Sequence, residues 1–138
     1  IMYPEEMCTP MRADLTDAGY EEMRTAEEVD AVLGKGEGTV LVMINSVCGC
    51  AAGNARPAAK AAAQHSKLPN KLTTVFAGQD KEAVAKVREY ALPYPPSSPS
   101  IVLFKDGEVA HFIERHHIEG RPAHMIADNL TAAFDEYC

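Results

Sequence analysis

The stretch that decides the fold is Val40-Leu41-Val42-Met43-Ile44, followed at once by Asn45-Ser46-Val47-Cys48-Gly49-Cys50. A short, continuous apolar run rich in branched residues is typical of a strand buried on both faces, so we expect a central and parallel strand. The Ala-rich run from about residue 50 to residue 64 predicts a helix, which Pro57 should bend or break locally. Two thiols therefore lie where a buried strand turns into a helix. Helix N-termini carry unpaired N–H groups that favour a thiolate over a thiol.

The rest of the chain surrounds this junction with alternating elements. Upstream, residues 4–18 predict a helix that Pro10 kinks or divides, and Thr25-Ala26-Glu27-Glu28 has the form of a capping box for a helix that runs to about residue 33. Downstream, the pattern predicts a strand over 72–76, a helix over 80–91, strands over 101–104 and 109–113 joined through Asp106-Gly107, and a helix over 122–137. This order predicts an α/β fold with a central mixed sheet flanked by helices.

Length and charge set the class of protein. The 138 residues argue for one domain, 1–138, with an N-terminal helical extension over 1–38 and the core over 39–138. The net charge of −7 disfavours binding to nucleic acid or to anionic membranes. No apolar run approaches the roughly 18 residues that a membrane span needs.

The four cysteines are Cys8, Cys48, Cys50 and Cys138. A structural disulfide framework is not expected, because a domain of this size folds without one and a disulfide between Cys48 and Cys50 would close a very short loop. The acidic start at Pro4-Glu5-Glu6 does not resemble a signal peptide. We therefore expect a cytoplasmic location, with a catalytic or sensing role for the thiol pair.

The order of elements, with a thiol pair after the first core strand and Pro99 before the hairpin, resembles the thioredoxin fold. The spacing is closer to the bacilliredoxin family, whose hallmark is Cys-Gly-Cys in place of Cys-X-X-Cys. The segments that carry this resemblance are Asn45–Gly53, Phe76–Ala83, Ser97–Ser100, Ile118–Gly120 and Asn129–Asp135, together with the terminal cysteine.

The resemblance implies a thiol–disulfide oxidoreductase that removes bacillithiol, a small thiol, from mixed disulfides on cytosolic proteins, with disulfide isomerase activity as a further possibility. Bacillithiolated proteins and bacillithiol would be its partners, and it would need no cofactor and no metal. We expect Cys48, at the start of the helix, to be the nucleophile and Cys50 to be the resolving thiol. We assign substrate binding to Gly49, Ser98 and Pro99, with a cis bond before Pro99 that lets the backbone of Ser98 pair with a bound peptide.

Other interpretations of the same residues stay open at this point. Cys48 and Cys50 could instead form a metal- or iron–sulfur-binding module, or a redox sensor without turnover. We expect His111, His116, His117 and His124 to be ordinary surface imidazoles, with His116 and His117 pointing opposite ways along an extended segment. Arg115 and His116 are further candidates for binding an anionic small thiol. A solvated position is expected for Arg56.

Overall fold

The computed structural model describes residues 2–138, so Ile1, the first residue of the predicted domain, lies outside the described residues. Five strands form one mixed sheet in the order β1-β3-β2-β4-β5. β1, β3 and β2 run parallel, whereas β4 is antiparallel to β2 and β5 is antiparallel to β4. The strands are β1 (Glu21–Glu22), β2 (Thr39–Asn45), β3 (Lys71–Phe76), β4 (Ser100–Lys105) and β5 (Glu108–Ile113).

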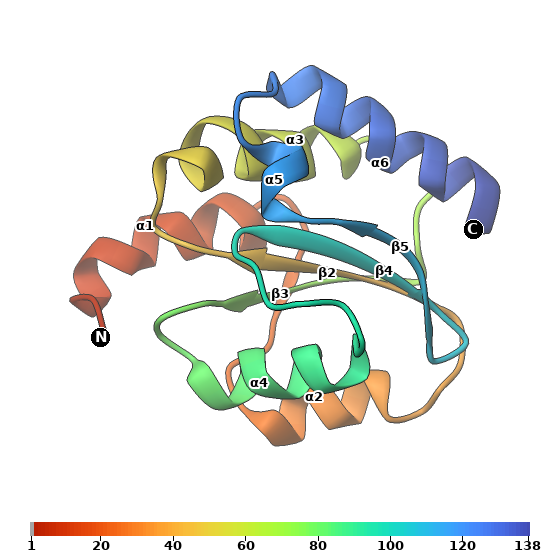
Figure 1. The fold of residues 1–138 in the computed structure, drawn as a ribbon, viewed down its shortest axis with the longest axis horizontal. Helices are drawn as coiled ribbons and strands as arrows, with labels where there is room; N and C mark the ends of the chain where they lie inside the picture. Colours follow the sequence, from red (N-terminus) through yellow and green to blue (C-terminus); the bar gives the residue numbers. More distant parts are fainter. Residues whose placement is uncertain (1) are drawn as a thin grey trace.

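Helices cover both faces of this sheet (Figure 1), as the sequence predicts for a thioredoxin-like α/β fold. The helical elements are α1 (Glu5–Thr16), α2 (Ala26–Leu33), the π-helical turn η1 (Ala51–Ala55), α3 (Arg56–Ala62), α4 (Lys81–Tyr90), α5 (Arg115–Ile118) and α6 (Ala123–Tyr137). Figure 1 shows α2 and α4 together on one side of the sheet and α3 and α6 on the other. Within residues 2–138, no helix has both the length and the hydropathy that crossing a membrane requires.

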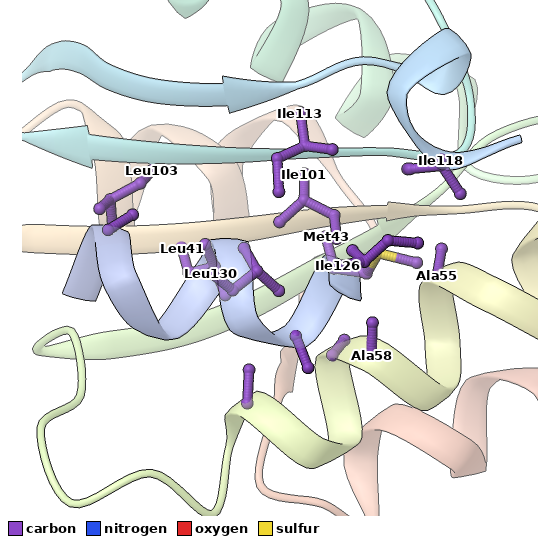
Figure 2. Close-up of a cluster of buried hydrophobic side chains, with 14 of the residues drawn as sticks. Leu41, Met43, Ala55, Ala58, Ile101, Leu103, Ile113, Ile118, Ile126 and Leu130 are labelled. Atoms are coloured by element: carbon purple, nitrogen blue, oxygen red, sulfur yellow. The ribbon is translucent and has the colours of Figure 1, made fainter. Parts of the chain in front are cut away.

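Two hydrophobic cores result from this layering, one on each face of the sheet, and β2 contributes side chains to both of them. Every residue of β2 is buried. Leu41 and Met43 point toward α3 and α6, and Figure 2 shows their side chains meeting those of β4 and α6. Val40, Val42 and Ile44 point to the opposite face and pack with the residues of α2 and α4. The prediction of a central strand is confirmed, although β2 is parallel only to β3.

The expected elements form close to their predicted bounds, with local differences. The capping box of α2 is confirmed, since Glu28 N donates to Thr25 Oγ1 and Thr25 N donates to Glu28 Oε1. The hairpin turn is confirmed too, with Asp106 and Gly107 both at positive φ. Pro10 does not divide the first helix, because α1 is continuous across it. The N-terminal 38 residues are not only helical, because β1 pairs with β3 at the edge of the sheet.

The break expected near Pro57 takes the form of η1. Pro57 has no N–H to donate, and the helix widens just before it, where Arg56 N donates to Ala51 O five residues back. The predicted single helix is therefore a π-helical turn followed by α3.

Candidate functional site

Cys48 and Cys50 lie between the end of β2 and η1, at the strand-to-helix junction that the sequence predicts. The N–H groups of Ala51 and Ala52 both donate to the carbonyl oxygen of Cys48, so a helical turn begins at this residue. Both cysteines are free and partly buried. Their sulfur atoms lie 2.7 Å apart, which places each thiol within direct reach of the other.

The two thiols differ in acidity because their surroundings differ. Burial opposes ionisation of Cys48, but hydrogen bonds from the Cys50 thiol, the Ser46 hydroxyl and backbone N–H groups outweigh it and lower the pKa of Cys48. Burial and the interaction with Cys48 raise the pKa of Cys50. Ser46 Oγ lies 3.2 Å from Cys48 Sγ. The pair therefore favours a thiolate at Cys48 and a thiol at Cys50.

A buried arginine supports the loop that carries Cys48. Arg56 is 3% exposed, so the expectation of a solvated side chain is wrong. The turn of η1 directs Arg56 toward the end of β2, where its Nη1 donates to Asn45 Oδ1 at 2.9 Å and to Ser46 O at 2.8 Å. Asn45 in turn accepts from Ser46 N and donates to Met11 O. This chain of hydrogen bonds fixes the backbone of Ser46 and, through it, the hydroxyl beside Cys48.

The proline loop approaches the site through Arg115. The Ser98–Pro99 bond is cis, as the resemblance predicts, and the Leu92–Pro93 bond is also cis. Arg115 Nη1 donates to Ser98 O at 3.0 Å, and Arg115 N donates to Ser97 Oγ at 3.4 Å. Arg115 also lines the cavity that holds the thiols, so this one side chain connects the proline loop to the Cys-Gly-Cys segment.

That cavity is shallow and has a volume of about 370 Å³. Gly49 lies in its wall, and a Cβ added there would meet no atom within 4 Å. Gly49 does not have a positive φ, so the backbone itself does not require glycine at this position. The open space over Gly49 is therefore available to a ligand. The lining residues are Cys48, Gly49, Cys50, Asn54, Arg115, Glu119 and Gly120.

No histidine of residues 2–138 lines the cavity that holds the thiols. His116 and His117 do not point opposite ways, because α5 is a short helix and their ring centroids are 4.0 Å apart. Within residues 2–138, the one group of three His, Cys, Asp or Glu side chains arranged to hold a metal ion is Glu114, His116 and His117. Neither Cys48 nor Cys50 belongs to that group. His111 is paired with Asn129 instead, at 2.6 Å.

The other two cysteines are separate from the pair. Cys8 is fully buried on α1, and burial raises the pKa of its thiol. Cys138 follows α6 and is partly buried against the core, so it is less exposed than its terminal position suggests.

This fold and this placement of the thiols define a thioredoxin-like protein. The family model described as disulphide isomerase matches residues 3–138. A bacilliredoxin of Cytophaga hutchinsonii is 60% identical over 135 residues, covering 98% of this chain and 99% of the relative. Bacilliredoxins of Geobacillus kaustophilus and Salinibacter ruber are 55% and 54% identical, each over 99% of this chain and over 94% and 81% of their own lengths. The chain belongs to the bacilliredoxin family, and these relationships support an oxidoreductase role in thiol redox chemistry.

Proposed function

We propose that the protein is a thiol–disulfide oxidoreductase that removes bacillithiol from mixed disulfides on cytoplasmic proteins. The observation that carries this proposal is the opposed acidity of two thiols whose sulfurs are 2.7 Å apart in one open cavity. A thiolate attacks a disulfide far faster than a thiol does, and a neighbouring thiol can then resolve the product. The names of the relatives support bacillithiol as the small thiol.

The reaction uses two exchanges. The Cys48 thiolate attacks the bacillithiol sulfur of the mixed disulfide, the old S–S bond breaks, and the target protein leaves as a thiolate that takes up a proton. Cys50 then loses its proton and attacks Cys48 Sγ, which releases bacillithiol as a thiolate. The product is a Cys48–Cys50 disulfide, and an external thiol reductant must supply two electrons to restore the starting state.

The test oxidises the protein with bacillithiol disulfide and locates the adduct by mass spectrometry. We expect the Cys50→Ala variant to hold one bacillithiol on Cys48 and the Cys48→Ala variant to hold none on Cys50. Cys138→Ala serves as the matched control and should behave as the wild type. Absence of an adduct at Cys48 would contradict the proposal.

Turnover on a bacillithiolated target protein decides the role of Cys50. If Cys50 resolves the adduct, Cys50→Ala releases one equivalent of target thiol and then stops unless a small thiol is added. Full multiple turnover by Cys50→Ala without added thiol would show that Cys50 contributes little. No release by the wild type would favour a redox sensor instead.

Disulfide isomerisation is a second candidate, favoured by the description of the matching family model. Isomerisation regenerates the attacking thiolate, so it needs Cys48 but not Cys50. We expect Cys50→Ala to keep the ability to reshuffle a scrambled disulfide protein while it loses net reduction. Elemental analysis of protein purified without a tag tests the metal-binding alternative, for which stoichiometric zinc or iron held by the thiols is the required result.

A further inference from the structure

We propose that Arg115 forms a subsite for a carboxylate group on the small thiol, so that the cavity selects mixed disulfides whose small thiol is anionic. The inference rests on the proposed thiol–disulfide exchange and specifies its substrate class. It assigns a substrate-binding role to Arg115 in addition to its contact with the proline loop.

The first argument is the position of the guanidinium. Arg115 shares the cavity wall with both thiols, and among residues 2–138 it is the one cationic side chain in that wall. Hydrogen bonding to Glu119, followed by the electrostatic interaction with each cysteine in its ionised form, raises the pKa of Arg115. The guanidinium therefore lies within electrostatic range of both sulfurs, where a group attached to a bound small thiol would be placed.

The second argument is the set of hydrogen bonds that Arg115 makes. Its Nε donates to Glu119 Oε1 at 2.6 Å and its Nη1 donates to Ser98 O at 3.0 Å. These two contacts orient the planar group, and no acceptor within residues 2–138 receives a hydrogen bond from its Nη2. An arginine held in this way presents free N–H donors in the fork geometry that carboxylates accept.

The third argument concerns charge. The protein has a net charge of −7, so an anionic ligand is repelled by most of the surface and needs a local cation. Arg115 is partly offset by Glu119, and an incoming carboxylate would share the guanidinium with it. The subsite would therefore orient a ligand that is already held by an S–S bond rather than bind the free acid tightly.

The subsite also determines which sulfur is attacked. With the carboxylate on Arg115, the sulfur of the small thiol lies next to Cys48, and the sulfur of the target protein points away. The Cys48 thiolate then forms its new bond to the small-thiol sulfur, the old S–S bond breaks, and the target protein leaves as a thiolate. Attack on the other sulfur would join Cys48 to the target protein instead.

The experiment compares two adducts that differ in charge and not in shape. One single-cysteine target protein carries 3-mercaptopropionate in one preparation and 3-mercaptopropionamide in the other. The Cys50→Ala variant reacts with each, and the rate of target-thiol release is divided by the rate with free cysteine. Mass spectrometry identifies what is attached to Cys48.

We expect the carboxylate adduct to react roughly tenfold faster than the amide adduct, the size of effect that a charge-assisted hydrogen bond at a partly exposed site provides. Adding Arg115→Gln should abolish this preference. Arg121→Gln removes the same charge from a side chain that lines a different cavity, and it should keep the preference.

Three outcomes would overturn the subsite. One is equal rates for both adducts, which would leave the proposed function intact. Another is an equal fall in the rate of target-thiol release from both adducts in Arg115→Gln. That result would show that Arg115 acts only through the proline loop or by contacting an acidic group of the target protein. The third is no reaction of either adduct, which would overturn the proposed function as well.

Discussion

The Ser46 hydroxyl contributes to the acidity of Cys48, together with the Cys50 thiol and backbone N–H groups. The Ser46 side chain does not cap the helix, and its Oγ lies 3.2 Å from Cys48 Sγ. A hydroxyl is a donor that can rotate toward a charged acceptor, so it stabilises the thiolate more than the thiol. The difference between Cys48 and Cys50 follows from such contacts rather than from the sequence spacing alone.

The prediction at this scale concerns pH. Because the pKa of Cys48 is lowered, its alkylation by iodoacetamide should rise with pH and reach a plateau at a lower pH than that of free cysteine. Ser46→Ala removes one donor to the thiolate and should move the rise to higher pH, with alkylation at neutral pH slower by roughly three- to tenfold. Ser66→Ala, at an exposed loop position, is the control and should leave the profile unchanged. An unchanged profile in Ser46→Ala would contradict the role of the hydroxyl.

Among the elements, those with a clear sequence pattern were predicted and those defined by their neighbours were not. β2, the capped α2 and the β4–β5 hairpin each have a local signal: a buried apolar run, a Thr-X-X-Glu box and an Asp-Gly turn. β1 has two residues and exists because β3 pairs with it, and α5 has four residues, which is too short for a hydrophobic period. Neither could be recognised without the sheet in place.

The same distinction applies to the candidate site. The thiol pair and the proline loop were found because they are contiguous in sequence. The burial of Arg56 and the position of Arg115 beside the thiols depend on tertiary packing, in one case on the π-helical turn and in the other on α5. A spacing of residues cannot predict which side of a widened helix faces the sheet.

The element-scale prediction tests the attachment of α3 to the end of β2. Arg56→Met keeps a long apolar stem but leaves Asn45 Oδ1 and Ser46 O without this donor, so we expect the free energy of unfolding to fall by roughly 2–4 kcal/mol. Cys48 alkylation should also slow in the variant, since Ser46 is no longer held in place. Urea unfolding and the alkylation rate measure the two effects.

Lys60→Met is the matched control for this experiment. Lys60 also lies on α3 but is half-exposed, so its replacement should change the free energy of unfolding by no more than about 0.5 kcal/mol. Arg56→Lys keeps the charge and should recover part of the stability. Equal behaviour of Arg56→Met and Lys60→Met would show that the buried hydrogen bonds contribute little.

For the whole molecule, a buried arginine joins the N-terminal segment to the sheet. Arg12 on α1 is 6% exposed and forms ion pairs with Glu5 of the same helix, Glu22 of β1 and Asp80 at the start of α4. Its guanidinium also lies 5.0 Å from the ring centre of Phe76 in β3. One side chain therefore connects α1 and β1 to β3 and to the start of α4.

We expect Arg12→Met to reduce the free energy of unfolding by roughly 2–4 kcal/mol, because it leaves carboxylates without their partner at a largely buried site. Arg24→Met is the control: Arg24 contacts Glu5 and Asp80 too but is half-exposed, and its loss should cost less than about 1 kcal/mol. Urea unfolding of both variants at neutral pH is the measurement. A smaller loss for Arg12→Met than for Arg24→Met would contradict the connecting role.

The same network makes the free energy of unfolding depend on pH, with stability lost as the pH falls. The hydrogen bond from Arg12, followed by other contacts, lowers the pKa of Glu5 in the folded protein. The stabilisation is therefore present above the pKa of Glu5 in the unfolded chain, about 4.3, and is lost as the pH falls through its lower folded pKa. Arg12→Met should show less loss of stability than the wild type when the pH is lowered through this range.

The five-residue turn of η1 has a consequence for variation in chain length. A π-helical turn is an α-helix that has gained one residue by insertion, and each residue of an α-helix advances the direction of its side chains by about 100°. Deleting one residue between positions 51 and 55 would let an ordinary helix form without a break. In an unbroken α-helix an extra residue would rotate the segments on either side by that angle, but the wider turn absorbs it. Removing the extra residue together with the wider turn therefore leaves Arg56 and the two sulfurs in their present relation. A shortened chain of this kind should stay folded and helical and keep its sulfur chemistry.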